Sequence, residues 1–238
     1  MPKVPMLPQP AASRDPVRED SFAEALRGFG PAGILAILVI LAGNVLFLPL
    51  SALLVLAWVW RSRTPWREIG YAAPKNWIAS AAIGIAFGIS LKFALKALVM
   101  PLLGADPVNP YYHYLAGNKA AIPSTLYLLI VGAGFGEETV FRGFLFERLG
   151  KLFGSGTGAR IAIVLITSLL FGVAHYSSQG AMGTEQGIIT GLIFGTIFAI
   201  TGRLFTLMCA HAAFDLTAYA MIYWNFETAV AHLIFKAR

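Results

Sequence analysis

Apolar residues fill long stretches of the chain from residue 31 onward, and short polar segments separate these stretches. A run of about 18 or more apolar residues with few charges is long enough to cross about 30 Å of hydrocarbon as a helix. Lipid cannot hydrogen-bond to an open backbone, so such runs are expected to be helical. There are about six of them, at 31–60, 77–103, 124–153, 161–179, 187–202 and 204–224. The pattern predicts an all-α, polytopic membrane helix bundle.

The composition also indicates an integral membrane protein. Hydrophobic residues make up 57% of the 238 residues and charged residues 13%, and the mean hydropathy is +0.69. Soluble domains are about 45–50% apolar and about 25% charged. The formal net charge of +6 comes mainly from basic residues near the ends of the apolar runs. This placement is typical of contacts with the lipid bilayer and its headgroups, and it argues against nucleic acid as a partner.

The first 30 residues differ from the rest of the chain. They carry prolines and mixed charges, and they lack the short apolar core and cleavage site of a secretory signal. This composition predicts a mostly disordered N-terminal arm over residues 1–30, in which a short helix can start at Ser21. Residues 31–238 are then expected to form one membrane-embedded domain, because about six spans leave no room for a second.

Basic residues indicate which loops face the cytoplasm. They are concentrated after the first apolar run and around the glycine-rich turn GSGTG, namely Arg61, Arg63, Arg67, Lys75, Arg148, Lys151 and Arg160. Both segments are therefore predicted to be cytoplasmic. Arg18 and Arg27 disagree with this assignment. They favour a cytoplasmic N-terminus, although a single first span would put the two ends of that span on opposite sides.

Two other patterns within the spans have structural explanations. Small residues recur at every fourth position of the fifth run, at Gly187, Gly191, Gly195 and Ala199. Such a stripe lets another helix approach closely, so we interpret it as a packing face. Lys92 and Lys96 lie one turn apart near the far end of the second run, where long side chains can carry the ammonium groups to the membrane interface. The alternative role for these lysines is to hold a substrate carboxylate.

Ionisable residues inside the spans are few, and they occur in three short strings. GEETVFRG, LLFGVAHY and CAHAAFDL contain Glu137, Glu138, Arg142, His175, His211 and Asp215. Such groups are costly in a membrane, and they usually face a partner or a water-filled cavity. His113 and His232 lie in a loop and in the tail, where a surface position is expected.

The spacing of the first string assigns different tasks to its two acids. Glu138 and Arg142 are four residues apart, with the acid N-terminal to the base, which favours an ion pair on one helix face. Glu137 lies about 100° further round the helix, so it remains free to bind water or take a proton. Taken alone, the Glu138–Arg142 pair is more often structural, and a single buried histidine is more often a packing residue. Three such strings in one bundle favour a functional site, because apolar packing would serve stability better.

Helix geometry brings the strings to a similar depth. The third and fourth spans form a hairpin around Gly156, with Glu137 nineteen residues before the turn and His175 nineteen after it. Both would lie about 28 Å from the turn, and His211 about 12 Å into the last span from Arg203. If the hairpin projects beyond the bilayer, all three strings meet in one polar cavity. His211 and Asp215 share a helix face, so the carboxylate can orient the imidazole.

A carboxylate and two histidines that converge in a cavity can polarise water, either around a metal ion or by hydrogen bonds alone. We therefore expect a hydrolase in which Glu137, assisted by His175, takes a proton from water that attacks a peptide carbonyl. His211 and Asp215 would stabilise the oxyanion or help to hold a divalent metal such as zinc. If a metal is bound, its expected ligands are Glu137, His175 and His211. The HExxH signature of common zinc proteases is absent from the sequence.

With these residues in place, the sequence resembles the CPBP or Abi group of intramembrane proteases. This group includes the type 2 CAAX prenyl endopeptidases and bacterial proteins linked to bacteriocin processing and immunity. The resemblance rests on EETVFR at 137–142, FGVAH at 171–175 and HAAFD at 211–215, and it covers about residues 69–223. It implies an all-helical bundle with a cavity open to the cytoplasmic side.

The resemblance also implies roles for single residues. Glu137 and His175 would activate water, Glu138 and Arg142 would form the supporting pair, and the third motif would line the oxyanion side. Members are commonly described as metalloproteases, although a metal-free mechanism has also been argued. The last motif position is often Asn, and here it is Asp215. Because Asp donates a hydrogen bond only when protonated, this difference favours orientation of His211 or metal binding over oxyanion stabilisation.

The leading hypothesis is thus a multi-pass membrane endopeptidase that cuts peptides or membrane-associated proteins near the cytoplasmic face, CAAX-type substrates included. The alternative is a non-catalytic membrane scaffold or a bacteriocin-immunity-type protein. An ion or proton pathway would need acids spread over several depths, whereas here they cluster.

Overall fold

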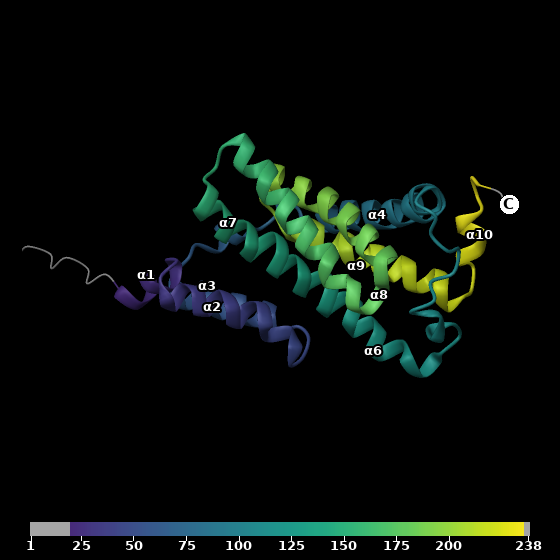
Figure 1. The fold of residues 1–238 in the computed structure, drawn as a ribbon, viewed down its shortest axis with the longest axis horizontal. Helices are drawn as coiled ribbons and strands as arrows, with labels where there is room; N and C mark the ends of the chain where they lie inside the picture. Colours follow the sequence, from purple (N-terminus) through teal and green to yellow (C-terminus); the bar gives the residue numbers. More distant parts are fainter. Residues whose placement is uncertain (1–19, 236–238) are drawn as a thin grey trace, which may run out of the picture.

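The computed structural model describes residues 20–235, and their regular structure is entirely helical (Figure 1). The main helices are α1 (Ser21–Arg27), α2 (Pro31–Ala42), α3 (Leu50–Ser62), α4 (Trp77–Ala94), α5 (Met100–Leu102), α6 (Ile122–Tyr127), η6 (Leu128–Phe144), α7 (Leu145–Phe153), α8 (Thr157–Thr201), α9 (Phe205–Tyr223) and α10 (Glu227–Ala231). The short turns of helix are η1 (Gly43–Val45), η2 (Trp66–Ile69), η3 (Leu95–Val99), η4 (His113–Leu115) and η5 (Lys119–Ala121). The prediction of an all-α membrane bundle is confirmed.

Three of the predicted spans correspond to three continuous helices. These run over Trp77–Leu102, Lys119–Phe153 and Phe205–Tyr223. The second of them contains η6, whose turns are wider than those of an α-helix over 17 residues. By length and composition, four helices of the described residues can cross a membrane, or five if the bent pair Ser21–Arg27 and Pro31–Val45 is one span.

The fourth and fifth predicted spans are the two arms of α8. This helix of 45 residues bends back at Gly180, whose φ of 62° and ψ of −161° interrupt the helical backbone. The arms then pack against each other. A Cβ atom added at Gly187 would lie 3.0 Å from Gly172 Cα, and one added at Gly191 would lie 2.9 Å from Ser168 Cα. The predicted packing role of the glycine stripe is confirmed, because only small residues permit this approach.

The first predicted span is wrong as a single helix. The run from residue 31 to 60 instead forms a hairpin of α2 and α3, of 12 and 13 residues. Each helix is about 18–20 Å long, which is shorter than the hydrocarbon layer. The turn contains Pro49, and Asn44 and Ser51 hydrogen-bond to each other's backbone N–H, both at 2.9 Å. These residues break helices and form turns, so they explain the reversal.

The hairpin returns the chain to the end from which it started. The helix expected from Ser21 is present as α1, and it packs beside the end of α3, where Trp58 Nε1 donates to Leu26 O at 3.1 Å. Arg27 and Arg61 therefore lie on the same side. This geometry removes the disagreement for Arg27, whereas Arg18 lies outside the described residues. Residues 1–19 of the predicted arm lie outside the described residues.

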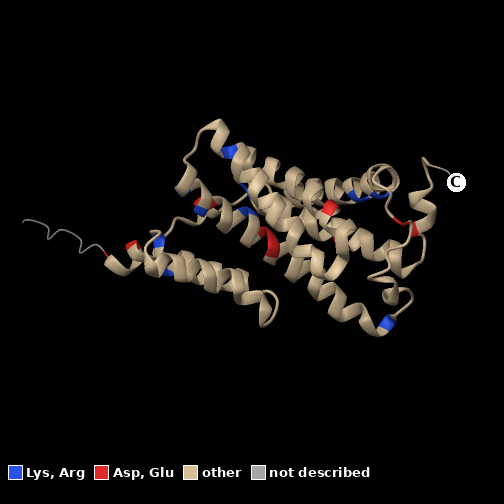
Figure 2. Cartoon of the chain, in the orientation of Figure 1, with Lys and Arg blue, Asp and Glu red and all other residues tan. Residues whose placement is uncertain are grey.

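Most basic residues gather at one end of the bundle, here called the basic end (Figure 2). Arg148 Nη1 donates to Arg27 O at 2.7 Å, and Lys151 pairs with Glu68 at 3.1 Å. The beginning of α9 is also there, because Leu204 N donates to Gly70 O. The other end, here called the loop end, is formed by residues 103–118 and α10. At this end the last residue of α9, Tyr223, accepts a hydrogen bond from Gly117 N.

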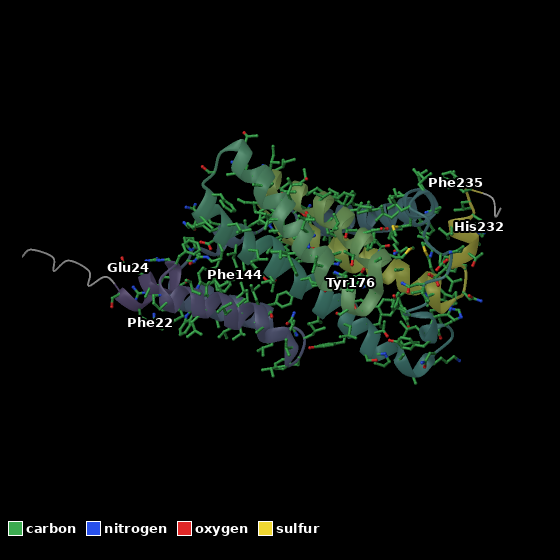
Figure 3. The ribbon with its side chains drawn as sticks, viewed as in Figure 1. Phe22, Glu24, Phe144, Tyr176, His232 and Phe235 are labelled. Atoms are coloured by element: carbon green, nitrogen blue, oxygen red, sulfur yellow. The ribbon has the colours of Figure 1, made fainter. Side chains whose placement is uncertain are left out.

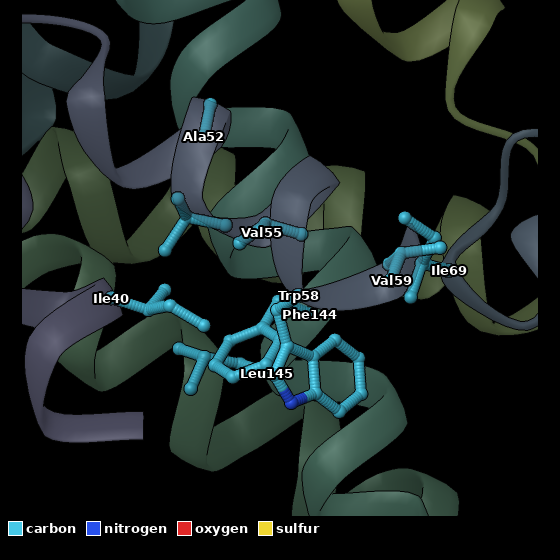
Figure 4. Close-up of a cluster of buried hydrophobic side chains, with 9 residues drawn as sticks. Ile40, Ala52, Val55, Trp58, Val59, Ile69, Phe144 and Leu145 are labelled. Carbon is cyan, nitrogen blue, oxygen red and sulfur yellow. The ribbon is translucent and has the colours of Figure 1, made fainter. Parts of the chain in front are cut away.

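Two apolar clusters hold the helices in register. The first joins α2 and α3 to η6 and α7 around Ile40, Trp58 and Phe144 (Figure 4). The rings of Trp58 and Phe144 meet edge to face, with their centres 5.1 Å apart. The second lies between α8 and α9 and comprises Phe194, Phe198, Leu204, Leu207 and Ala210. In addition, Cβ atoms added at Gly84 and Gly88 of α4 would clash with carbonyl oxygens of α9. These contacts fix α9, which carries the third motif, against α4 and α8.

Candidate functional site

The three strings of ionisable residues meet in the middle of the bundle. Glu137, His175, His211 and Asp215 come from η6, the first arm of α8, and α9, and all four line one cavity of about 350 Å³. Glu138 and Arg142 do not line this cavity, and they lie directly behind His211. The prediction that the three strings meet in one polar cavity is therefore confirmed. Their catalytic roles stay a prediction.

The adjacent acids of η6 have different surroundings. The Glu138 side chain is completely buried, and its Oε1 accepts from Arg142 Nη1 at 2.9 Å, which is the expected pair. The Glu137 side chain is 25% exposed and faces the cavity. One helix position thus separates an acid held by an arginine from an acid open to a ligand.

His211 is held from behind by Glu138. Its Nδ1 lies 2.7 Å from Glu138 Oε1, the oxygen that Arg142 also binds. Its Nε2 faces the cavity acids, at 3.7 Å from Glu137 Oε2 and 3.6 Å from Asp215 Oδ2. Because a carboxylate only accepts, Nδ1 carries a proton and donates it to Glu138. Glu138, rather than Asp215 alone, therefore orients the imidazole.

His175 is oriented by the backbone of its own helix. Its Nδ1 lies 2.7 Å from Phe171 O, four residues earlier. The carbonyl oxygen can only accept, so Nδ1 is the protonated nitrogen and Nε2 remains available on the cavity side. The neighbouring Tyr176 points outward from α8 and is 64% exposed (Figure 3). Tyr176 thus takes no part in the cavity.

Aromatic rings around Arg142 are functional candidates that the sequence reasoning missed. The guanidinium carbon lies 4.5 Å from the ring centre of Phe171 and 5.6 Å from that of Phe194. Phe171 also meets the His175 ring at 4.6 Å. The available signal was the position of Phe171, four residues before His175 on the same helix face. These rings stabilise a buried cation and limit the freedom of both histidines.

The polar cluster is not internally satisfied. Within the described residues, four buried side-chain atoms have no hydrogen-bond partner, namely Glu137 Oε2, Glu138 Oε2, Arg142 Nη2 and Tyr219 Oη. Buried polar groups are rarely left unpaired in a purely structural network. Unused acceptors beside a cavity are instead what a site for water and a polar substrate requires.

Lys92 is buried in the bundle, so the prediction that it carries its ammonium group to the membrane interface is wrong for this residue. Lys92 is 8% exposed and lines the cavity, where its Nζ donates to Gln186 Oε1 at 3.0 Å. Lys96 forms an ion pair with Glu227 of α10 at 3.2 Å. Both side chains face the bundle because α4 packs closely against α9 through Gly84 and Gly88.

The loop end contributes a further cavity residue, Tyr112, which no sequence pattern indicated. Burial raises the pKa of its phenol above the ordinary value. The hydroxyl therefore stays neutral at physiological pH and can donate a hydrogen bond into the cavity. His113 and His232 do not line the cavity. His113 is exposed, and His232 lies beside α10 at the C-terminal end (Figure 3).

The cavity extends toward the loop end. Its lining continues from His211 along α9 to Ile222 and includes Tyr112, Tyr114 and Leu115 of the loop. Toward the basic end, it is closed by the second apolar cluster, whose members are at most 6% exposed. The basic loops that were predicted to be cytoplasmic lie at the other end of the bundle from this part of the cavity, and the side of the membrane that the cavity faces stays a prediction.

The arrangement of the expected metal ligands decides whether they can hold a metal ion. Between residues 20 and 235, no group of three or more His, Cys, Asp or Glu side chains is arranged to hold a metal ion. Glu137, His175 and His211 in this arrangement thus do not fit a three-ligand centre. A divalent metal at these residues stays a prediction.

Comparison with known proteins identifies the segment that carries the site. A model of the family described as type II CAAX prenyl endopeptidase Rce1-like matches residues 119–217. The curated proteins and the solved structures gave no match. The matched segment contains η6, α8 and most of α9, and with them all the candidate site residues. Over residues 119–217 the chain is therefore similar to the Rce1-like type II CAAX prenyl endopeptidases, in agreement with the resemblance carried by the three motifs.

Proposed function

We propose that this protein is an intramembrane endopeptidase that hydrolyses peptide bonds with water activated by Glu137. The observation that supports the proposal best is the arrangement of one cavity. It presents the open carboxylate of Glu137 beside two histidines that are each held through Nδ1. The family match supports proteolysis of the CAAX type as the reaction.

The proposed reaction adds water across the peptide bond. Glu137 and His175 Nε2 hold the water, and Glu137 takes its proton as the oxygen attacks the carbonyl carbon. The negative charge on the carbonyl oxygen is stabilised by His211 in its protonated form, through the N–H at Nε2. Glu137 then gives its proton to the leaving nitrogen as the C–N bond breaks, which yields a carboxylate and an amine.

Each neighbour of His211 has a distinct role in this scheme. Glu138 keeps the ring fixed through Nδ1, and Arg142 holds Glu138 in place. Asp215 faces Nε2 at 3.6 Å, where a carboxylate favours the protonated ring. The aspartate therefore supports oxyanion stabilisation through His211 and need not donate a hydrogen bond itself.

The test is proteolysis of an internally quenched peptide library by the purified full-length protein in detergent. Glu137→Gln is expected to lower kcat/KM by about 10²- to 10⁴-fold, because it removes the general base without changing side-chain volume. Glu185→Gln and His113→Ala are matched controls, since both residues are exposed and lie outside the cavity. Cleavage that persists in Glu137→Gln would contradict the mechanism. An inactive wild type that still binds a protein partner would support the scaffold alternative.

Metal analysis of the same preparations addresses the predicted ligands. The mechanism above predicts that activity survives chelators and that the purified protein lacks stoichiometric zinc. Stoichiometric zinc that is lost together with activity in His175→Ala would instead support a metal centre.

The substrates proposed are peptides or membrane-associated proteins that enter from the loop end, where the cavity leads. Accessibility of single cysteines decides which side of the membrane this is. Lys119→Cys reports on the loop end and Ser155→Cys on the basic end, both in a Cys209→Ala background. Labelling of only Ser155→Cys by an impermeant maleimide added to intact cells would put the loop end, and the cavity, on the cytoplasmic side. Labelling of only Lys119→Cys would support the assignment from basic loops.

A further inference from the structure

A further cavity lies at the basic end, as an open groove between η2, α7 and both ends of α8. This basic groove has a volume of about 360 Å³. Three of its lining residues are cations, Arg67, Lys151 and Arg160, and two are acids. They belong to the basic residues that gather at this end of the bundle (Figure 2). Sites for small ligands have volumes of about 300–1,000 Å³, so the groove is large enough for one.

Both acids of the basic groove already have a cation as partner. Glu68 Oε2 lies 3.1 Å from Lys151 Nζ, and Glu147 forms the buried pair with Arg148. The two arginines of the groove are exposed and form no ion pair among residues 20–235. The groove therefore presents two guanidinium groups without a counter-ion. Such groups bind phosphate oxygens well, because their planar donors match two oxygens at once.

The floor of the basic groove is apolar. The rings of Phe146 and Phe198 meet edge to face there, with their centres 5.0 Å apart, and the neighbouring Ile163 is buried. Phe198 also belongs to the second apolar cluster, which closes the cavity of Glu137 toward the basic end. Packed side chains thus separate the groove from the proposed reacting groups. The groove is a site of its own, and a ligand in it would bridge α7 and α8.

The position of the basic groove along the bundle indicates what kind of ligand reaches it. The groove lies at the turn between α7 and α8 and at the end of α8, where candidate membrane spans end. Trp60, Trp66 and Trp77 lie at the same end of the bundle and are all exposed. Tryptophan is enriched at the membrane–water interface. The groove therefore opens at the level of the lipid headgroups, where basic pockets between spans bind anionic headgroups.

We propose that the basic groove binds the phosphate of an anionic phospholipid, with Arg67 and Arg160 as its main ligands. A free phosphate ion would offer the same oxygens. A lipid is favoured because Phe153 and Ile161, which are next to groove residues in the sequence, are exposed and give acyl chains an apolar surface. A zwitterionic headgroup would bring its own ammonium group close to the arginines, which costs Coulomb energy. The proposal does not depend on the proposed protease function.

The experiment measures thermal unfolding of the full-length protein in micelles of a neutral detergent with added lipid. Phosphatidylglycerol is expected to raise the unfolding midpoint in a saturable manner, by about 5–10 °C at about 100 times its Kd. Phosphatidylcholine with the same acyl chains should raise it much less. Inorganic phosphate at the same concentration should have no effect, because it lacks the acyl chains.

Two double variants locate the effect. Arg67→Gln/Arg160→Gln should weaken the apparent affinity for phosphatidylglycerol at least about tenfold, because it removes both charge-assisted contacts. Lys75→Gln/Arg203→Gln is the matched control. It removes the same charge from exposed residues of the same end that do not line the groove, so the affinity should stay within about threefold. Arg67→Lys/Arg160→Lys should keep part of the affinity, since it keeps the charge but not the bidentate geometry.

Each contrary result has a distinct meaning. Equal stabilisation by phosphatidylglycerol and phosphatidylcholine would overturn the proposal, and so would equal stabilisation by inorganic phosphate. Equal losses in the two glutamine variants would also overturn it, because general surface charge would then attract the lipid. The lipid comparison on the wild type needs no variant, so a double variant that fails to fold leaves the proposal testable. Lipid-specific stabilisation of a protein that cleaves no peptide would support the groove and count only against the protease.

Discussion

Two buried glutamate–arginine pairs lie along the same continuous helix, Lys119–Phe153, and they differ in how fully their hydrogen bonds are satisfied. In α7, Arg148 binds Glu147 through both Nε and Nη2 and uses Nη1 for the backbone oxygen of Arg27. Its guanidinium also lies 4.5 Å from the Trp58 ring centre. This pair has few unused donors, and it attaches α1 to the bundle.

The pair in η6 is incomplete by comparison. Glu138 Oε1 accepts from both Arg142 and His211, while Glu138 Oε2 and Arg142 Nη2 have no partner among residues 20–235. Next to this pair, Glu137 opens onto the cavity. Figure 2 shows one group of acids in the middle of the bundle and another group of charges at the basic end.

The comparison shows that a buried ion pair alone does not mark a functional site. Both pairs consist of the same residue types, and in each the side chains are at most 3% exposed. The feature that distinguishes them is the presence of unused polar atoms in a pair whose neighbours, Glu137 and His211, line a cavity. Unused polar atoms are costly in a structure that serves only stability, so they are the more informative signal.

The largest effect that separates the two pairs is expected from Arg142→Met. The substitution leaves Glu138 buried with only His211 as its partner, which should lower the free energy of unfolding by about 3–5 kcal/mol. It should also lower kcat/KM by more than about 100-fold, because His211 loses its fixed orientation. Denaturation in mixed micelles and the peptide assay measure the two quantities. Retention of activity in a folded Arg142→Met would contradict the supporting role of this pair.

The contrast between the pairs also shows which parts of the site were predictable. The Glu138–Arg142 pair and the separate direction of Glu137 follow from helix geometry within five residues, so the sequence alone was enough. The shared depth of Glu137 and His175 follows from the equal number of residues between each of them and one turn, because both arms of the hairpin are helical. The family motifs gave the same residues independently.

Other features depend on tertiary contacts or on turn residues that an apolar run conceals. The hairpin of α2 and α3 was missed because its hydropathy is continuous, although Asn44 and Pro49 are turn residues. Lys92 was misplaced because a lysine near a span end reaches the interface only if its helix face is free. Here α9 covers that face through the glycines of α4. The contact between Glu138 and His211 joins residues 73 positions apart, which no local pattern reports.

A smaller effect is expected from Arg148→Met, the matched substitution in the Glu147–Arg148 pair of α7. It removes charge-assisted hydrogen bonds to Glu147 and to α1, which should cost about 1.5–3 kcal/mol of unfolding free energy. The loss is smaller than for Arg142 because α1 can move away and let water reach Glu147. Activity should stay within about threefold of the wild type, and limited proteolysis should cut near α1 more readily. A loss of activity as large as that of Arg142→Met would remove the distinction between the two pairs.

The smallest effect concerns a neutral contact made by the same helix. The Tyr71 hydroxyl lies 2.7 Å from Thr139 Oγ1, and Thr139 Oγ1 in turn donates to Phe135 O, so Tyr71 is the donor. Tyr71→Phe should therefore lower the free energy of unfolding by about 0.5–1.5 kcal/mol and leave activity unchanged. Burial raises the pKa of Tyr71 from 10.0 to about 12, so the phenol is neutral in the folded protein well above physiological pH.

This pKa fixes the pH dependence of the Tyr71 contact. A group whose pKa is raised by folding contributes its full stabilisation of the folded protein when the pH is below the pKa of the unfolded state. For Tyr71, this stabilisation is lost as the pH rises from about 10 toward about 12. The difference in unfolding free energy between wild type and Tyr71→Phe should thus be constant between about pH 6 and 9 and shrink only at higher pH. Denaturation in mixed micelles at several pH values measures it. A difference that changes between about pH 6 and 9 would show that Tyr71 is coupled to a charged group and does not form a separate neutral contact.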